Sequence, residues 1–289
     1  MFGESKFEIL NNIPEEYKPR TYLTKHVSTI EEVERVIHQS GLSFPLIFKP
    51  DLGERGWMVK KIKSREDILD YLQSCHFDFI IQQYVHLPLE FSVFYHRHPR
   101  EQKGRVTSVT MKQMLTVVGD GKSKLSELIY TKDRAKLQWD ILSKTFASQL
   151  NEIPAKGLEI ELVPIGNHCL GTMFINRNDL ITSKLSDSFD QISKNVPGFY
   201  FGRYDLRAAS FQDLENGKVA IMELNGCGAE PSHIYHPGAS LGKAIRDLFK
   251  HWQTIYSISI ANHKNGVEYL SLKKGIEIYK RFKAATTTS

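Results

Sequence analysis

The sequence predicts an α+β fold in two parts, and three observations support this prediction. Residues 21–85 alternate apolar, strand-like runs with two helical segments, and residues 86–202 add further strands and helices. Residues 203–224 form two apolar runs around a polar, glycine-containing connection. The length of 289 residues is enough for two domains with a substantial core. Hydrophobic residues at 41% and aromatic residues at 11% exclude a disordered chain.

The first part is expected to be a compact β-α-β-β-α-β unit at 21–85, after an N-terminal extension of residues 1–20. Its first helix begins in a capping-box pattern, because Ser28 is followed three residues later by Glu31. In chain order the predicted elements are a strand at 21–27, a helix from Ser28 to about Ser40, strands at 45–50 and 58–62, a helix at 64–74 with a polar cap, and a strand at 78–85.

The second and larger part is expected at 86–262, followed by a basic tail at 263–289. The Lys and Arg residues of the tail favour a solvated helix face over a membrane or nucleic-acid patch. In chain order the predicted elements are strands at 90–96 and 105–118, a long helix from about Lys132 to Leu150, strands near 159–165 and 172–175, a helix near 186–195, a hairpin of 203–208 and 218–224 around the DLENGK turn, and a helix from Ser240 to about Asn262.

Charge and cysteine usage limit the classes of partner and compartment. A formal charge of +5 and a pI near 8.9 are compatible with an anionic ligand and do not demand nucleic acid. No run of about 18 apolar residues occurs, and the first 30 residues are polar. The three cysteines are too scattered for a disulfide framework or a zinc site, so we expect buried thiols. A soluble, cytoplasmic protein is the expectation.

The hairpin carries three oxygen-bearing side chains at a suggestive spacing. Glu223 and Asn225 are two residues apart, so they point to the same face of their strand. If the two strands pair, Asp205 lies across from them on that face. Oxygen-only ligand sets suit hard cations, and carboxylates bind Mg²⁺ together with substrate phosphates. The alternative is a solvent-facing hairpin with ordinary surface charge, and the spacing alone leaves both open.

A second motif lies in the first part, in the segment FPLIFKPDLGERGWMVKKI at 44–62. Lys49 ends an apolar strand, and the loop after it contains Gly53 and Gly56. Small residues let backbone N–H groups approach an anion, and a lysine supplies a point charge for phosphate. The segment is neither a Walker A loop nor a dinucleotide fingerprint. By itself it favours an ordinary strand connection with a surface lysine.

The order of three modules resembles the ATP-grasp superfamily. These modules are PLIFKPDLGERG, then FIIQQYVHLPLEFSV, then the late Arg203-Tyr204-Asp205 and Glu223-Leu224-Asn225. The arrangement of the last two is similar to D-alanine-D-alanine ligase-like proteins, and VVGDGKSKLSELI at 117–129 resembles cyanophycin-synthetase-type ATP-grasp domains. The resemblance covers roughly residues 20–262. It implies an ATP-grasp fold, with two α+β subdomains around the nucleotide and without a full N-terminal pre-ATP-grasp domain.

The resemblance also implies a role for each matching residue. Lys49 would contact the nucleotide phosphates under the loop at Gly53 to Gly56, and Lys112 would be a second phosphate-binding lysine. Arg203 would stabilise charge on the transferred phosphoryl group and on the tetrahedral intermediate. Adenine would be read by the backbone at Gln82, Gln83, Tyr84 and Val85, ribose by Glu90, and two Mg²⁺ ions, replaceable by Mn²⁺, would be held by Asp205, Glu223 and Asn225.

The activity implied is an ATP-dependent carboxylate-amine ligase that works through an acyl phosphate. Its substrates would be small and amino-acid-like or peptide-like, with no nucleic acid or membrane and with a homodimer allowed. Only about twenty residues precede Thr21, so part of the usual acceptor site would be missing or supplied by another chain. One alternative is a catalytically weak ATP-binding regulator or scaffold, and another is a binder of anionic surfaces through residues 273–283. His168, beside Cys169, is interpreted mainly as structural.

Overall fold

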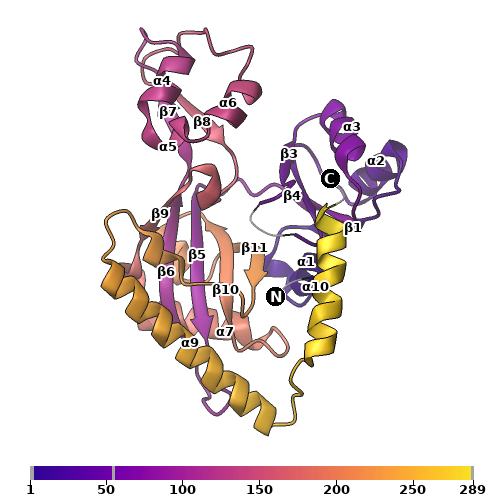
Figure 1. The fold of residues 1–289 in the computed structure, drawn as a ribbon, viewed down its shortest axis with the longest axis vertical. Helices are drawn as coiled ribbons and strands as arrows, with labels where there is room; N and C mark the ends of the chain where they lie inside the picture. Colours follow the sequence, from indigo (N-terminus) through magenta and orange to yellow (C-terminus); the bar gives the residue numbers. More distant parts are fainter. Residues whose placement is uncertain (1–2, 54–55, 288–289) are drawn as a thin grey trace. The chain divides into compact units, whose positions relative to one another are not determined.

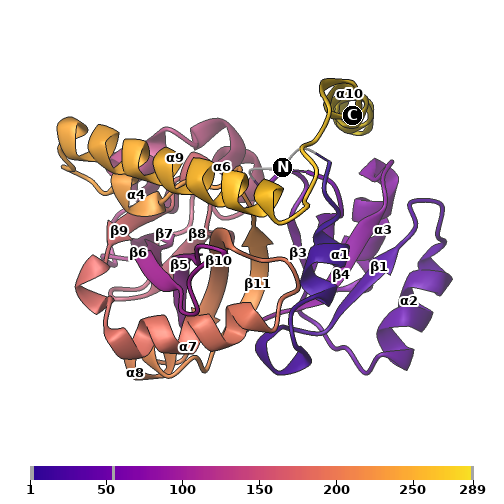
Figure 2. The same ribbon diagram turned by 90° about the horizontal axis from the view of Figure 1, so that it is seen from below.

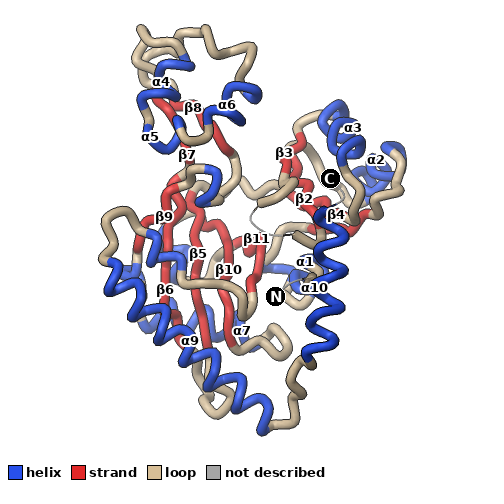
Figure 3. The backbone as a smooth tube through the Cα atoms, viewed as in Figure 1, coloured by secondary structure: helices blue, strands red, loops and turns tan. Residues whose placement is uncertain are grey.

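The structure is a computed structural model that describes residues 3–53 and 56–287 (Figure 1). It divides into two compact units, one formed by Met1–Met111 with Asn176–Ser289 and the other by Lys112–Ile175. The first unit contains two sheets built from antiparallel strand pairs, with helices packed on them (Figure 3). The predicted α+β class is therefore confirmed.

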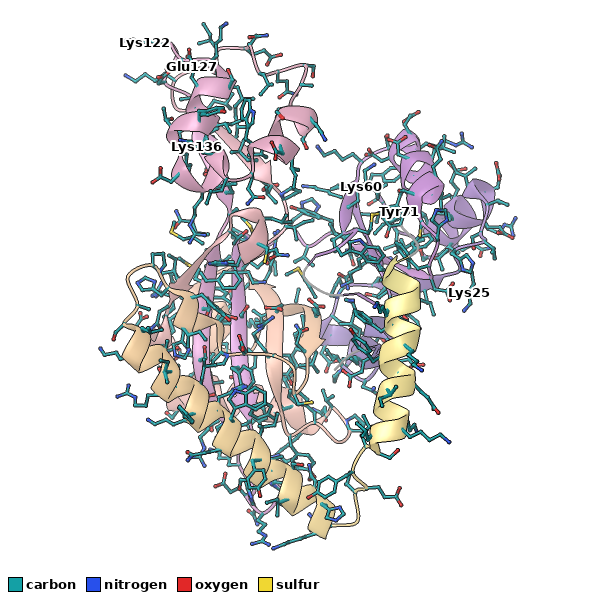
Figure 4. All side chains as sticks on the ribbon, in the orientation of Figure 1. Lys25, Lys60, Tyr71, Lys122, Glu127 and Lys136 are labelled. Atoms are coloured by element: carbon teal, nitrogen blue, oxygen red, sulfur yellow. The ribbon has the colours of Figure 1, made fainter. Side chains whose placement is uncertain are left out.

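The N-terminal sheet of the first unit has the strand order β1-β4-β2-β3. Its core includes buried residues from the strands and from both helices, among them Val33, Phe48 and Tyr71. Of these three, Figure 4 labels Tyr71. Each element was predicted to within a few residues. The bounds are β1 Thr21–Thr24, α2 Ile30–Gln39, β2 Leu46–Pro50, β3 Lys60–Ile62, α3 Arg65–Ser74 and β4 Phe79–Gln83.

Two local predictions in this sheet were wrong in detail. The capping box of α2 uses Thr29 and Glu32, not Ser28 and Glu31: the Thr29 hydroxyl accepts from Glu32 N at 3.3 Å, and the Glu32 carboxylate accepts from Thr29 N at 2.9 Å. Strand β1 ends at Thr24, three residues early. A turn begins there, because the backbone N–H of Ser28 donates to the carbonyl of Lys25 at 3.1 Å, and the Lys25 side chain (Figure 4) pairs with Asp78 at 2.7 Å.

The five-stranded sheet has the order β11-β10-β5-β6-β9, of which β11, β10 and β5 lie wholly in the first unit. Figure 2 shows α7 and α9 on opposite sides of it. The core on the α7 side joins Leu185 and Phe189 to Val93 and Tyr204, and a smaller core on the α9 side includes Phe94. The bounds are β5 Leu89–His96, β6 Arg105–Gln113, β9 Met173–Asn176, α7 Ser183–Lys194, β10 Phe201–Ala208, β11 Ala220–Asn225 and α9 Leu241–Lys264.

The connection within the predicted hairpin contains a short helix that was not predicted. Strands β10 and β11 do pair, but helix α8, Phe211–Glu215, forms between them with Ser210 as its N-cap. The Ser210 hydroxyl accepts from Asp213 N at 3.0 Å, and Leu214 is buried in the core. A capped, partly apolar segment of this kind favours a helical turn over an irregular loop.

The second unit has its own small core beside the two-stranded sheet of β7, Leu115–Val118, and β8, Glu159–Val163. Its helices are α4 Leu125–Thr131, α5 Asp133–Lys136 and α6 Trp139–Thr145. The predicted long helix from Lys132 to Leu150 is therefore wrong. Its apolar residues do not share one buried face, because Leu142 is buried while Leu137 is 81% exposed. The predicted strand at 105–118 is likewise divided between β6 and β7.

The remaining described segments are short or terminal. The N-terminal extension contains α1, Lys6–Asn11, and a 3₁₀ turn at Glu15–Tyr17, and the basic tail forms α10, Leu272–Thr287. Further 3₁₀ turns lie at His168–Leu170, Asn178–Leu180 and Ser232–Tyr235. Across the described helices, none combines the length and apolarity needed to cross a membrane.

The cysteine prediction was right about pairing and wrong in part about burial. All three thiols are free, and Cys75 is buried beside α3. Cys169 and Cys227 are exposed, because one lies in a 3₁₀ turn and the other in the loop after β11.

Candidate functional site

Lys49 lies in the interior of the first unit, near the end of β2. Its Nζ donates to Gln82 Oε1 at 3.1 Å and to the backbone carbonyl of Met222 at 3.0 Å. The side chain is only 6% exposed. Burial lowers the pKa of Lys49 to about 8, although the carboxylates of Glu223 and Asp205 favour the charged form. The bond to Met222 joins the N-terminal sheet to β11, one residue before Glu223.

The strand register places Asp205 directly opposite Glu223, and Arg203 opposite Asn225. Residues directly opposite one another in antiparallel strands share a face of the sheet. The predicted convergence of Asp205, Glu223 and Asn225 on one face is therefore present. Asn225 Nδ2 donates to Asp205 Oδ2 at 3.0 Å, and the Ser92 hydroxyl of β5 donates to Asp205 Oδ1.

Arg203 links this face to the loop after β11. Its guanidinium donates to Asp205 Oδ2 at 3.2 Å, to the carbonyl of Glu230 at 3.2 Å and to the hydroxyl of Ser232 at 3.2 Å. Burial would lower the pKa of Arg203, but the neighbouring Asp205 carboxylate outweighs burial and raises it. The buried Nε of Arg203 has no hydrogen-bond partner among the described residues. An unsatisfied buried donor of a cation is suited to an anionic ligand.

A further pair lies on the same face, two residues along the strands. Glu90 of β5 is opposite Arg207 of β10, and the Arg207 guanidinium donates to Glu90 Oε2 at 3.0 Å. Arg207 also donates to the carbonyl of Val85 at 2.9 Å and lies over the ring of Tyr84, 5.6 Å from its centroid. Lys61 Nζ lies over the same ring at 4.0 Å. These contacts bring Glu90 and the segment after β4 together.

The residues that were expected to contact adenine differ in exposure. Gln82 is 3% exposed, and its side-chain amide nitrogen Nε2 donates to the hydroxyl of Thr21 at 3.1 Å. Gln83 is exposed and accepts from the backbone N of Arg20 at 3.4 Å. Its neighbour Tyr84 is half-buried. The structure thus uses Gln82 to hold Lys49 and Gln83 to hold the segment before β1.

The glycine loop after Lys49 is described at its ends only, because residues 54 and 55 lie outside the described part of the chain. Gly53 and Gly56 have φ values of 154° and 72°, which L-residues with a side chain rarely adopt. Lys6 of α1 donates to the carbonyl of Gly53, and Asp51 accepts from Phe7 N at 2.9 Å. Helix α1 therefore holds the start of the loop.

Two of the expected residues lie in the second unit. Lys112 has its Nζ 6.0 Å from the centroid of the Phe174 ring. His168 packs its ring on the same Phe174 ring at a centroid distance of 5.3 Å, and burial lowers its pKa. This packing agrees with the structural interpretation of His168.

Sequence reasoning missed Ser92, Arg207 and Lys6. Arg207 and Ser92 could have been found from strand alternation, since each is two residues from an expected site residue on its strand. Lys6 had no local signal, because its contact with Gly53 spans 47 residues of chain. Among the described residues, no group of three or more His, Cys, Asp and Glu side chains could hold a metal ion. The expected metal ligands are the carboxylates of Asp205 and Glu223 and the amide of Asn225, so they do not form a group of three such side chains.

Comparison with known proteins gives distant structural similarities. No family model matches the chain, and no curated protein matches it. Among solved structures it is similar to the D-alanine-D-alanine ligase of Coxiella burnetii, with a TM-score of 0.49 and 11% identity over 96% of this chain and 61% of that one.

Two other solved structures resemble the chain at a similar level. The bifunctional glutathione synthetase of Pasteurella multocida has a TM-score of 0.40 and 17% identity, over 85% of this chain and 35% of that one. The carboxyaminoimidazole ribonucleotide synthase of Aspergillus clavatus, complexed with ATP, has a TM-score of 0.43 and 12% identity, over 82% and 51%. The chain spans about a third to three fifths of these three proteins. All three TM-scores lie below 0.5.

Proposed function

We propose that the protein is an ATP-dependent ligase that joins a carboxylate to an amine through an acyl phosphate. One observation carries the proposal. Lys49 Nζ contacts the Met222 carbonyl at 3.0 Å, which brings the lysine of the glycine-loop motif beside the strand that holds Glu223 and Asn225. A buried lysine next to paired carboxylates is the arrangement that a metal-bound polyphosphate requires.

The nucleotide would bind between Lys49 and the face of the five-stranded sheet. Lys49 has three N–H donors, and among the described residues Gln82 and Met222 engage two of them, so the third would serve a phosphate oxygen. The loop at 53–56 would cover the phosphates. The backbone from Gln82 to Val85 would contact adenine, Glu90 would bind ribose, and Lys112 would add a second cation for phosphate.

The donor set fits a hard divalent cation. Asp205 and Glu223 supply carboxylate oxygens and Asn225 an amide oxygen, with no sulfur or imidazole among them. The amide of Asn225 now donates to Asp205, and a half-turn of the amide would instead present its oxygen. Bound Mg²⁺, or Mn²⁺ in its place, would neutralise the charge that develops on the phosphoryl oxygens.

The reaction would proceed in two steps, phosphoryl transfer to the carboxylate and then formation of the C–N bond. A carboxylate oxygen attacks the γ-phosphorus of ATP, the bond to the β-phosphate oxygen breaks, and ADP leaves with the electron pair. The amine nitrogen then attacks the acyl carbon, the C–N bond forms, inorganic phosphate leaves with the electron pair of the C–O bond, and the nitrogen gives up one proton to a base or to solvent. Arg203, with its unsatisfied Nε, would hold the developing negative charge in both steps.

The competing proposal is an ATP-binding regulator or scaffold without turnover. It is favoured by the engagement of Asp205 by three donors, Ser92, Arg203 and Asn225, which must rearrange before a cation can bind. A binder of anionic surfaces through α10 is supported only by its exposed lysines, Lys273, Lys274 and Lys280. The substrates are proposed to be amino acids or short peptides, with completion of the acceptor site by another chain and a homodimer as further proposals.

The test is release of ADP from Mg-ATP with pairs drawn from a panel of amino acids and dipeptides, with hydroxylamine as a general amine. Hydroxylamine captures acyl phosphates as hydroxamates without needing a specific acceptor site. Hydroxamate formation that depends on ATP, divalent metal and a carboxylate supports the ligase. ATP binding by calorimetry without any carboxylate-dependent ADP release would favour the regulator instead.

A further inference from the structure

A cavity of about 800 Å³ lies in the first unit between the five-stranded sheet and α9. Its floor includes Phe94 and His96 of β5 and Phe201 of β10, and α9 contributes His251 and Thr254 to the opposite wall. This volume is within the range of sites for organic ligands. None of the residues expected to bind nucleotide or metal lines it.

The cavity lies on the same face of the sheet as Asp205 and Glu223, farther along the strands. Going along β5, Ser92 is opposite Asp205, Phe94 is opposite Arg203, and His96 is opposite Phe201. A strand rises about 3.4 Å per residue, so the floor at Phe94 begins about 7 Å beyond Ser92. The loop after β11 makes the same connection, because Ser232 contacts Arg203 while its neighbour His233 lines the cavity.

The interior presents neutral imidazoles against aromatic rings. Burial lowers the pKa of His96 to about 4, helped by the nearby Arg105, and burial also lowers the pKa of His251. The His251 ring lies 5.0 Å from the Phe94 ring and 4.9 Å from the Phe201 ring, between centroids. His251 is 8% exposed, and its Nε2 has no hydrogen-bond partner among the described residues. A neutral imidazole nitrogen in this state can accept a hydrogen bond.

The charged groups of the lining are mostly paired or at the rim. Arg105 and Glu101, both exposed, form an ion pair at 2.9 Å, and Lys250 is exposed. Asp247 accepts from His233 at 3.3 Å if that ring nitrogen carries the proton. The remaining titratable lining residue is His98. The buried cation that could pair with a carboxylate is Arg203, which does not line the cavity. The interior of the cavity offers hydrogen-bond acceptors for N–H groups.

A second interpretation of the same residues does not hold. Ser108, His233 and Asp247 form a hydrogen-bonded series with distances of 2.8 and 3.3 Å, similar to a nucleophilic triad. Ser108 is only 1% exposed and does not line the cavity. A nucleophile must reach its substrate. These three residues therefore anchor the loop after β11 to β6 and to α9.

We propose that this cavity binds the amine substrate, and that the amine belongs to an amino acid or short peptide with an aromatic or branched apolar side chain. The inference rests on the proposed function and names the acceptor class. The side chain packs on Phe94 and Phe201, and the amine N–H groups donate to an imidazole of the lining, which includes His96 and His251. When the C–N bond forms and phosphate leaves, one amine proton passes to a neutral imidazole of the cavity.

The first experiment measures binding alone. L-Phenylalanine is titrated into the full chain without ATP, and the imidazole signals of His96 and His251 are followed by NMR, with L-glutamate as the comparison ligand. We expect saturable shifts with L-phenylalanine and none with L-glutamate. No saturable shift with L-phenylalanine, or equal shifts with both ligands, would overturn the inference.

A matched pair of α9 variants locates the site. Thr254 lines the cavity and is half-buried, whereas Ser259, on the same helix, is exposed and does not line it. Thr254→Trp should weaken L-phenylalanine binding by at least about tenfold through steric exclusion, and Ser259→Trp should leave it within about twofold. Ser257→Trp, at another lining position, serves if Thr254→Trp melts early. Unchanged binding in both lining variants would place the ligand elsewhere.

A trapping assay separates this inference from the proposed function. If the protein is a ligase, Thr254→Trp should lower coupling to L-phenylalanine at least about tenfold more than it lowers hydroxamate formation, because hydroxylamine is small and needs no cavity. Absence of hydroxamate in the parent contradicts the proposed function and leaves the binding result standing. Normal hydroxamate formation together with unimpaired coupling in Thr254→Trp contradicts the cavity assignment alone.

Discussion

Asp205 and Glu223 face each other across β10 and β11 but are engaged very differently. Asp205 is 5% exposed and is bonded by Ser92, Arg203 and Asn225, whereas Glu223 is half-buried and lies near the Lys49 charge. A cation that enters must compete with existing donors for Asp205. We therefore expect Glu223 to be the carboxylate on which the proposed metal binding depends most directly.

The substitution Glu223→Gln tests this dependence. The amide keeps the shape but loses the charge that holds a divalent cation, so phosphoryl transfer should fall by at least about a hundredfold. The melting temperature without nucleotide should change little. Turnover in Mg-ATP within a few-fold of the parent would remove Glu223 from the metal site, and a large drop in stability would show that it is a structural charge.

Lys49 should make ATP binding depend on pH. Its pKa is about 8 in the free protein, and phosphate favours the charged form, so binding above pH 8 requires uptake of a proton. The ATP affinity should therefore fall by up to about tenfold per pH unit above pH 8 and be flat just below it. The unfolded lysine titrates near 10.4, so the burial penalty on folding is fully present below pH 8 and is relieved between about pH 8 and 10.

Calorimetry in two buffers of different ionisation enthalpy measures that proton uptake. We expect uptake of a proton at pH 8.5 to 9 in the parent and little in Lys49→Arg, since arginine stays charged throughout this range. Equal uptake in the two proteins would assign the titration to another group.

At the scale of elements, short polar caps decide where the helices begin. Thr29 and Glu32 exchange two hydrogen bonds at the start of α2, and Ser64 accepts from Asp67 N at 3.3 Å at the start of α3. Both caps lie on exposed loops, so they act by satisfying backbone N–H groups and not through tertiary packing.

The capping box of α2 gives a matched pair of variants. Thr29→Ala should lower the free energy of unfolding by about 1 kcal/mol, because the N-cap oxygen is lost. Ser28→Ala, one residue earlier, should change it by no more than about 0.5 kcal/mol, since Ser28 is outside the observed box. Denaturant unfolding measures both values. A larger loss for Ser28→Ala would restore the capping box first predicted from Ser28 and Glu31.

At the scale of the whole molecule, the two units have separate cores. Leu142 and Leu115 belong to the core of the second unit, together with Ile129, whereas the cores of the first unit contain none of them. Packing energy is local to contacting side chains, so damage to one core is expected to stay in its own unit.

Leu142→Ala should destabilise the second unit by about 2 to 5 kcal/mol, the range for a fully buried leucine. Amide hydrogen exchange should show lost protection in β7 and β8 with little change in β5 and β10. Exposed Leu137→Ala, on the neighbouring segment, is the control and should leave exchange unchanged. Loss of protection spread equally over both units would show that they unfold as one.

The sequence by itself determined the strands and helices of the N-terminal sheet, the alternation that puts Glu223 and Asn225 on one face, and the pairing partner of Asp205. These follow from local periodicity and spacing, which act over a few residues. The break of the predicted helix after Lys132 did not follow, because burial of Leu142 and exposure of Leu137 depend on the packing around them.

Only the tertiary structure decided how the distant parts of the site meet. The contact of Lys49 with Met222 spans 173 residues and that of Glu90 with Arg207 spans 117, and no local pattern encodes such pairs. The cavity under α9 is likewise formed by residues from Phe94 to Ile258 that no motif joins. Local sequence sets which face a side chain occupies; long-range packing and burial then set its neighbours, and with them the pKa of Lys49 and of His96.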